Sequence, residues 1–163
     1  MNDAVFAGKR RAISLPEGLV VFGFFAWGAV AAAFAPLPLP QLPAERMLLS
    51  LLLLSLPLLG SSGFGWLLLP LEMLGFGHYS ETAVLCWFPV RGAETLPQLS
   101  PLLFRLFVTP VTLLAGVYAL CASGALRAAV QRASPSARGE YQQALCLTAF
   151  FALLGLAGVF YFI

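Results

Sequence analysis

One stretch decides the fold of this chain: residues 47–88 read MLLSLLLLSLPLLGSSGFGWLLLPLEMLGFGHYSETAVLCWF. As a helix it would extend for roughly 63 Å, whereas one bilayer crossing needs about 20 residues. The stretch is too long for one span and about right for two. The sequence GSSGFG at residues 60–65 interrupts it. We therefore predict a hairpin of two apolar helices that fold back on each other at this break.

The composition predicts that lipid surrounds most of the chain. Hydrophobic residues make up 60% of the sequence and charged residues only 10%, whereas a soluble domain usually carries about 25% charged residues. Four long runs contain no Asp, Glu, Lys or Arg: 18–43, 47–71, 106–126 and 141–163. We predict a polytopic, all-α integral membrane bundle. The net charge of +2 is too small and too dispersed to indicate nucleic-acid binding.

Five helical segments are expected within a single transmembrane domain. Pro16 precedes the first segment, and the prolines of the PLPLPQLP sequence end it, because proline lacks the amide donor and clashes with the preceding turn. Its apolar run is longer than a signal peptide's usual core, so we expect a retained helix. Residues 127–140 are polar and are expected to form a loop. The predicted segments are 17–34, 44–59, 65–88, 103–126 and 141–163.

Basic residues predict the orientation in the cell membrane. They gather before the first segment and before the last one, and the positive-inside rule places both regions in the cytoplasm. Both can be cytoplasmic only if the central block begins and ends outside, so the N-terminus is expected inside and the C-terminus outside. The first arm, 44–59, is short, so a re-entrant hairpin is the alternative to a full crossing. The basic residues of these two regions are Lys9, Arg10, Arg11, Arg127, Arg132 and Arg138.

The break contains a motif that resembles the nucleophile loop of rhomboid intramembrane proteases. Gly60, Ser61, Ser62 and Gly63 include a GxSG sequence, and those enzymes pair the serine with a histidine held about 3 Å away. The only histidine of this chain, His78, lies sixteen residues beyond Ser62 on the same block. That offset is roughly 20 Å or more along a helix. We therefore favour a tight packing turn over catalysis, and we predict no enzyme.

Polar residues beyond the break form the other candidate cluster. A carboxylate at membrane depth costs roughly 2.5–3.5 kcal/mol, so Glu72 is expected to face the bundle interior or water. Pro70, two residues earlier, frees a backbone carbonyl. His78 and Glu81 are three residues apart and share a helix face, whereas Glu72 points elsewhere. Structural anchoring or interfacial placement, partner binding, and ion or proton transport all remain open for this cluster.

Arg105 and the cysteines complete the candidate residues. Arg105 lies among Leu and Phe, where it can snorkel to lipid headgroups or pair with a glutamate inside the bundle. The cysteines at 86, 121 and 146 are far apart and lack any CxxC or Cys/His pattern. We interpret them as small buried hydrophobes. No metal site and no cofactor are predicted.

The order of features in the centre of the chain resembles the stage II sporulation protein M family of multi-spanning membrane proteins. The matching features are the break at 60–65, the LLLPL sequence at 67–71, the GFG sequence at 75–77, Pro110, and the small residues at 122–125. The resemblance covers about residues 47–130. It implies a non-enzymatic membrane scaffold of a spore-forming bacterium, which helps assemble peptidoglycan-degrading partners at the engulfing septum. It carries over no catalytic residues.

Three functional hypotheses follow. The first is a scaffold or partner-binding subunit that contacts membrane lipids and other membrane or cell-wall proteins, with a homo-oligomer also open; bulky residues at Gly63 or Gly65 should then disrupt folding or assembly. The alternative is a small transporter or channel subunit with its site at the broken central hairpin, because interrupted helices often form substrate sites. The third is an intramembrane hydrolase that uses Ser61 or Ser62 and His78.

Overall fold

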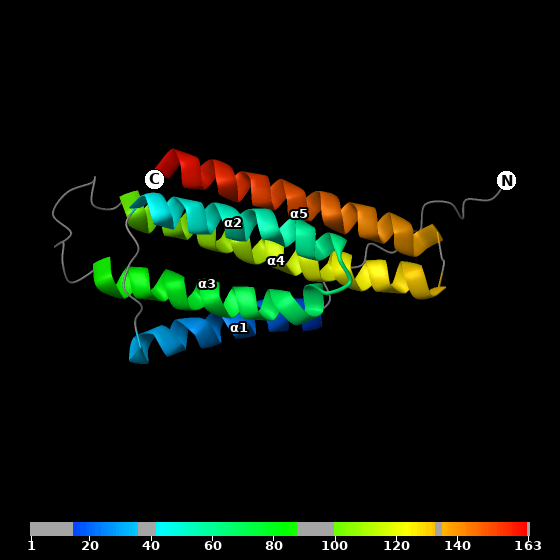
Figure 1. Cartoon of the computed structure of the whole chain (residues 1–163), viewed down its shortest axis with the longest axis horizontal. Helices are drawn as coiled ribbons and strands as arrows, with labels where there is room; N and C mark the ends of the chain where they lie inside the picture. Colours follow the sequence, from blue (N-terminus) through cyan, green and yellow to red (C-terminus); the bar gives the residue numbers. More distant parts are fainter. Residues whose placement is uncertain (1–14, 36–41, 88–99, 133–134, 163) are drawn as a thin grey trace.

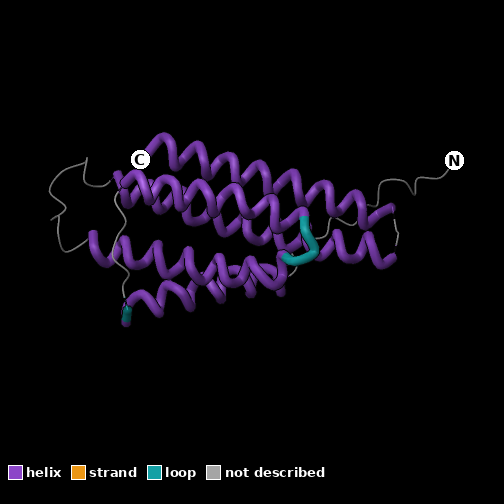
Figure 2. The backbone as a smooth tube through the Cα atoms, in the orientation of Figure 1, coloured by secondary structure: helices purple, strands orange, loops and turns teal. Residues whose placement is uncertain are grey.

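The computed structural model of the chain describes residues 15–35, 42–87, 100–132 and 135–162. Within these ranges the backbone forms helices joined by one short described turn at residues 62–64 (Figure 2). Successive helices run in opposite directions along one long axis (Figure 1). The prediction of an all-α bundle is confirmed. The five helices are α1 (Leu15–Phe34), α2 (Leu42–Ser61), α3 (Gly65–Trp87), α4 (Ser100–Arg132) and α5 (Pro135–Phe162).

Four of these helices are long and apolar enough to cross a membrane, namely α1, α2, α4 and α5. Twenty residues of helix extend for about 30 Å, which matches the hydrocarbon core of a bilayer. Large apolar side chains are exposed along the outside, including Trp27 at 71%, Leu58 at 70% and Leu153 at 65%. Water would not tolerate so much exposed apolar surface, so these side chains face lipid. The chain is a helical membrane protein.

Two groups of helices make up the bundle. α1 packs mainly on α3, while α2, α4 and α5 pack together on the other side (Figure 1). α4 contacts each of the other four helices and is the most buried of the helices that can span a membrane. α2 and α3 are neighbours in the sequence but contact each other little. The central hairpin therefore opens beyond its turn, and each arm belongs to a different group.

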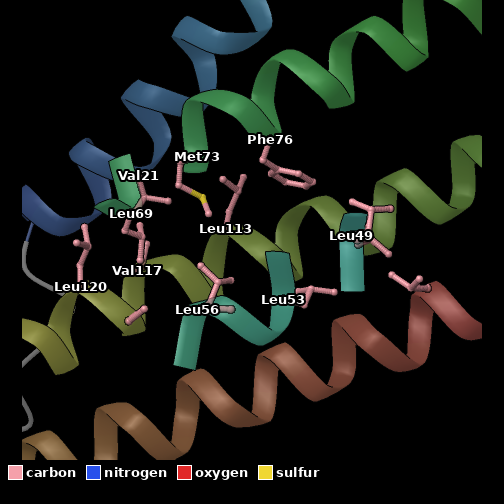
Figure 3. Packing of buried hydrophobic residues seen from close by; sticks show 14 residues of the cluster. Val21, Leu49, Leu53, Leu56, Leu69, Met73, Phe76, Leu113, Val117 and Leu120 are labelled. Carbon is pink, nitrogen blue, oxygen red and sulfur yellow. The ribbon is translucent and has the colours of Figure 1, made fainter. Parts of the chain in front are cut away.

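A hydrophobic core joins the two groups (Figure 3). Met73 of α3 is fully buried and lies between α1 and α4, where a Cβ added at Gly116 would come within 3.2 Å of its sulfur. The small residue at 116 therefore makes room for the long side chain at 73. Other members of the cluster, labelled in Figure 3, are Val21, Leu49, Leu53, Leu56, Leu69, Phe76, Leu113, Val117 and Leu120.

The structure corrects three predictions from the sequence. Residues 127–140 are mostly helical, because α4 continues to Arg132 and α5 begins at Pro135. Alanine, arginine and glutamine are good helix formers, and proline suits the first position of a helix. α2 has 20 residues, more than the predicted 44–59, so its length suits a full crossing. Cys146 is exposed rather than buried; Cys121 is half-buried, and the side chain of Cys86 lies outside the described residues.

Candidate functional site

The break at residues 60–65 is a packing turn that rests on α4. Gly60 is still helical and lies against Ala119, where an added Cβ would come within 3.1 Å of the alanine Cα. Gly65 begins α3 and lies against Ser123, at 2.8 Å for an added Cβ. The two contacted residues on α4 are four positions apart, so they lie on one face of that helix. The expected role of small residues at this break is therefore supported by close contact.

Ser61 and Ser62 use their hydroxyl groups to satisfy carbonyl oxygens at the end of α2. The Ser61 hydroxyl donates to the Leu58 carbonyl at 2.7 Å, and the Ser62 hydroxyl donates to the Leu59 carbonyl at 2.9 Å. The last carbonyls of a helix lack their usual helical donors, so these bonds act as a C-terminal cap, and the Ser62 amide adds to it by donating to the Leu59 carbonyl at 3.1 Å. The Phe64 amide donates to the Ser62 oxygen at 3.4 Å and extends this cap into the turn.

Arg127, near the C-terminal end of α4, binds the turn between α2 and α3. Its Nε donates to the Gly63 carbonyl at 2.6 Å, although 64 residues separate the two in sequence. A Cβ added at Gly63 would meet only this side chain, at 3.9 Å, which is ordinary van der Waals contact. Bulky residues at either Gly63 or Gly65 were predicted to disrupt folding or assembly, but the surroundings of the two glycines differ. Gly65 faces the core, whereas Gly63 contributes its backbone oxygen and has only the Arg127 side chain next to the position of an added Cβ.

Glu72 lies at the contact between α3 and α2. Its side chain is half-buried near Ser55 of α2, and its Oε2 atom is buried without a partner. Pro70 is buried inside α3, which continues through it. The missing amide at Pro70 leaves the Trp66 carbonyl without its usual helical donor. The expectation that Glu72 faces the bundle interior rather than lipid agrees with this position.

His78 and Glu81 lie farther along α3, away from the turn. The Nδ1 atom of His78 is 3.4 Å from the Thr82 hydroxyl, one helical turn away. The thirteen residues from Gly65 to His78 place the imidazole about 20 Å from the turn along the helix axis. Both side chains are half-buried. The structure therefore does not bring the serines of the turn and His78 together.

Arg105 belongs to the first turns of α4, and its side chain lies outside the described residues. The proposed pairing with Glu72 or Glu81 and the snorkelling alternative therefore both stay predictions. Among the residues that the structure does describe, groups of three or more His, Cys, Asp or Glu side chains able to hold a metal ion are absent.

The closest helix contact was not singled out from the sequence. α1 and α3 meet backbone to backbone at Gly28 and Gly77. A Cβ added at Gly28 would collide with the Leu74 carbonyl oxygen and lie 2.8 Å from the His78 amide nitrogen. A Cβ added at Gly77 would collide with the Phe25 carbonyl oxygen. Small residues let membrane helices approach this closely.

The outer face of α1 carries a shallow, open hollow of about 530 Å³. Gly23 lies in it, and a Cβ added there would meet nothing within 4 Å. Trp27 and Phe34 are 71% and 84% exposed and rise beside the small residues. Residues spaced three and four apart share one helix face, so the hollow follows α1 for about three turns. Its lining residues are Gly23, Ala26, Trp27, Val30, Ala31 and Phe34.

Comparisons of the chain with protein-family models, with curated proteins and with solved structures found no match. The function is therefore inferred from the geometry of the turn, the α1–α3 contact and the outer hollow.

Proposed function

We propose that this protein is a non-enzymatic membrane scaffold whose α1 helix binds a transmembrane helix of a partner protein. The hollow on the outer face of α1 is the observation that carries the proposal. It combines an open glycine with exposed aromatic side chains on a helix that packs mainly on α3. Small residues let a second helix come close, and aromatic side chains supply contact area.

The packing around the turn supports a structural role for the rest of the chain. The turn serines cap α2, and the turn glycines rest on α4. These serines and glycines of the turn hold the helices together. The resemblance to the stage II sporulation protein M family suggests the class of partner: a membrane-anchored enzyme of cell-wall breakdown, in a spore-forming bacterium.

The experiment that tests this proposal is photo-crosslinking from the hollow in the native membrane. A photoreactive amino acid replaces Trp27, and a matched control replaces Leu67, which is 66% exposed on α3. We expect a discrete protein adduct from position 27 and only lipid adducts from position 67. Equal lipid labelling from both positions, without a protein adduct, would contradict the proposal. An adduct with a second copy of this chain would show that the helix bound at the hollow belongs to a homo-oligomer and not to a different protein.

We further propose that the end of the bundle that holds the α2–α3 turn faces the cytoplasm. The beginning of α1, the α2–α3 turn, the end of α4 and the beginning of α5 lie toward the same end of the bundle (Figure 1). Arg127 lies at this end, and the basic residues at 9–11, 132 and 138 belong to the segments that lead to it. The positive-inside rule then places this end inside the cell.

Cysteine accessibility tests the orientation. The three native cysteines are replaced, and Ser61, which is exposed, is changed to cysteine. A membrane-impermeant thiol reagent should label Ser61→Cys only from the cytoplasmic side, and Gly92→Cys only from outside. The reverse labelling pattern would show that the bundle has the opposite orientation in the membrane. Labelling of both from one side would support a re-entrant hairpin.

A small transporter or channel subunit is the second candidate function. The buried, unpartnered Oε2 atom of Glu72 favours it, because intramembrane carboxyl groups often mark ion and proton paths. Flux in liposomes that depends on pH and disappears in Glu72→Gln would support this candidate. If the reconstituted protein shows no such flux, the transporter or channel function is ruled out.

A further inference from the structure

Arg127 lies where the membrane-spanning part of the bundle ends. α2 and α3 stop at their turn, whereas α4 and α5 extend beyond it at the same end (Figure 1). The Nε atom of Arg127 donates to the carbonyl oxygen of Gly63 in this turn, so the side chain is level with the ends of α2 and α3. From Arg127 to its end at Arg132, α4 rises about 7.5 Å, which is roughly the depth of a headgroup layer. Arg127 therefore lies at the boundary between acyl chains and headgroups.

The contact with Gly63 holds the guanidinium in place. Arg127 is exposed, and its Cγ and Nε atoms lie 3.9 Å from the position of a Cβ added at Gly63, so its stem rests against the turn. The bond to the Gly63 carbonyl, at 2.6 Å, uses only the Nε–H donor. The two terminal nitrogens keep their own N–H donors in a planar fork, a geometry that matches two oxygens of a phosphate. The turn thus positions a cation that is suited to bind phosphate.

Apolar side chains lie beside this cation. Phe64 in the turn and Leu67 in the first turn of α3 are each 66% exposed. Trp66 is half-buried, and its indole nitrogen is 3.4 Å from the position of a Cβ added at Gly124, about one helical turn before Arg127 on α4. A free anion or a soluble acidic protein would leave Phe64 and Leu67 uncovered. A phospholipid meets both requirements, because its phosphate can bind the guanidinium while its acyl chains cover the apolar side chains.

The charges at this end of the bundle favour a lipid with a net negative charge. The C-terminal end of α2 and the N-terminal end of α3 meet at the turn, so their opposite partial charges largely cancel and the arginine sets the local sign. A choline headgroup would place its cation among basic residues, whereas a phosphatidylglycerol headgroup adds no cation. In the segments that lead to this end, the acidic residues Asp3, Glu17 and Glu140 are outnumbered by the basic residues Lys9, Arg10, Arg11, Arg127, Arg132 and Arg138.

We propose that Arg127 and the α2–α3 turn form a binding site for one anionic phospholipid. The guanidinium binds the lipid phosphate, the Gly63 carbonyl fixes the guanidinium, and the acyl chains lie over Phe64 and Leu67. The site is separate from the hollow on α1 and does not depend on the scaffold function. It also holds for either orientation of the bundle, because the lipid is recognised by its charge and its apolar chains.

Quenching of Trp66 fluorescence by brominated lipid tests the site with the full chain in vesicles. Trp27→Phe and Trp87→Phe leave Trp66 as the reporter. Two vesicle samples contain the same mixture of phosphatidylcholine and phosphatidylglycerol, and a different one of the two lipids carries bromine on its acyl chains in each sample. We expect a preference of about fivefold for phosphatidylglycerol near Trp66, which is the gain that one arginine gives at an anionic membrane surface.

Matched variants separate this site from a general attraction of anionic lipid to a basic surface. Arg127→Gln and Arg138→Gln remove the same charge from the same end of the bundle, and Arg138 is exposed near the start of α5. The preference should be lost in Arg127→Gln and kept in Arg138→Gln, with circular dichroism showing that both variants are folded. A protein that retains only Trp27, on the outer face of α1, should show no preference.

Three outcomes would overturn the proposal. The first is equal quenching of Trp66 by the two lipids, or a preference that survives Arg127→Gln. The second is loss of the preference on adding inorganic phosphate at an ionic strength where chloride has no effect, which would assign the site to a free anion. The third is loss of the preference on adding polyglutamate under the same conditions, which would assign the surface to an acidic protein.

Discussion

The two faces of α1 each carry a glycine, and the two glycines have opposite surroundings. Gly28 on the inner face lies directly against the backbone of α3, so even one added carbon would collide. Gly23 on the outer face has nothing within 4 Å of an added carbon. One helix therefore uses the same residue type for tight internal packing on one side and for an open hollow on the other.

A glycine in a membrane helix is therefore explained by its neighbours and not by its residue type. At Gly28 the missing side chain is required by the fold. At Gly23 the fold does not require the missing side chain, because an added Cβ would meet nothing within 4 Å. A small residue that the fold does not need fits a role outside the chain, which is why we propose a partner helix there.

The largest expected effect is on the inner face. Gly28→Ala or Gly77→Ala should lower the free energy of unfolding by roughly 1–3 kcal/mol, because the new methyl group meets a backbone carbonyl that cannot rotate away. Unfolding in detergent with increasing denaturant measures the change. The matched control is Gly23→Ala on the same helix, which should be neutral or stabilising by up to about 1 kcal/mol, since alanine is the better helix former. Equal effects at 28 and 23 would contradict the described packing of α1 on α3.

The turn offers a second comparison of the same kind, with a smaller expected effect. Gly65→Ala should cost about 1–2 kcal/mol, because its new Cβ meets the Ser123 side chain at the edge of the core. Gly63→Ala should change stability by less than about 0.5 kcal/mol, as open surface positions usually do. The same unfolding experiment measures both.

A double-mutant cycle sharpens the test at the turn. Ser123→Gly removes the side chain that an alanine at 65 would meet, so the pair Gly65→Ala with Ser123→Gly should be less harmful than the sum of the single changes. Additive effects would show that the two residues do not contact each other.

The smallest expected effect is at Arg127. Arg127→Ala removes the bond to the Gly63 carbonyl and should lower stability by up to about 1 kcal/mol, because exposed charged contacts are worth little. Arg138→Ala, an exposed arginine near the start of α5, is the control and should be neutral in the same measurement. A loss that is equal in both variants would point to a general effect of charge and not to this bond.

Much of the fold could be predicted from the sequence because helices in lipid leave long apolar runs. All five helices follow such runs, and Gly60 and Gly65 of the predicted break lie close to Ala119 and Ser123 of α4. The ends of helices were less predictable. The polar residues around 127–140 resemble a loop by charge, but their helix propensity and Pro135 allow α4 and α5 to continue beyond the apolar region.

The helix pairing and the details of the candidate site could not be predicted in this way. Apolar sequence alone does not indicate that α3 packs mainly on α1 instead of on α2, its neighbour in the chain. The contacts of Gly28 with α3, and the position of Glu72 near Ser55, depend on that pairing. The hollow on α1 likewise becomes visible only once the inner face of the helix is known.

The most direct measurement for the proposed function fills the hollow while leaving the fold intact. Gly23→Leu places a large side chain between Trp27 and its neighbours, and Gly75→Leu is the matched control because its surroundings on α3 are equally open. Both variants carry the photoreactive residue at position 27, and the yield of the protein adduct is measured in the native membrane. We predict that Gly23→Leu loses the adduct while Gly75→Leu keeps it, with both proteins equally stable. An adduct that survives in Gly23→Leu would contradict a partner helix seated on this face of α1.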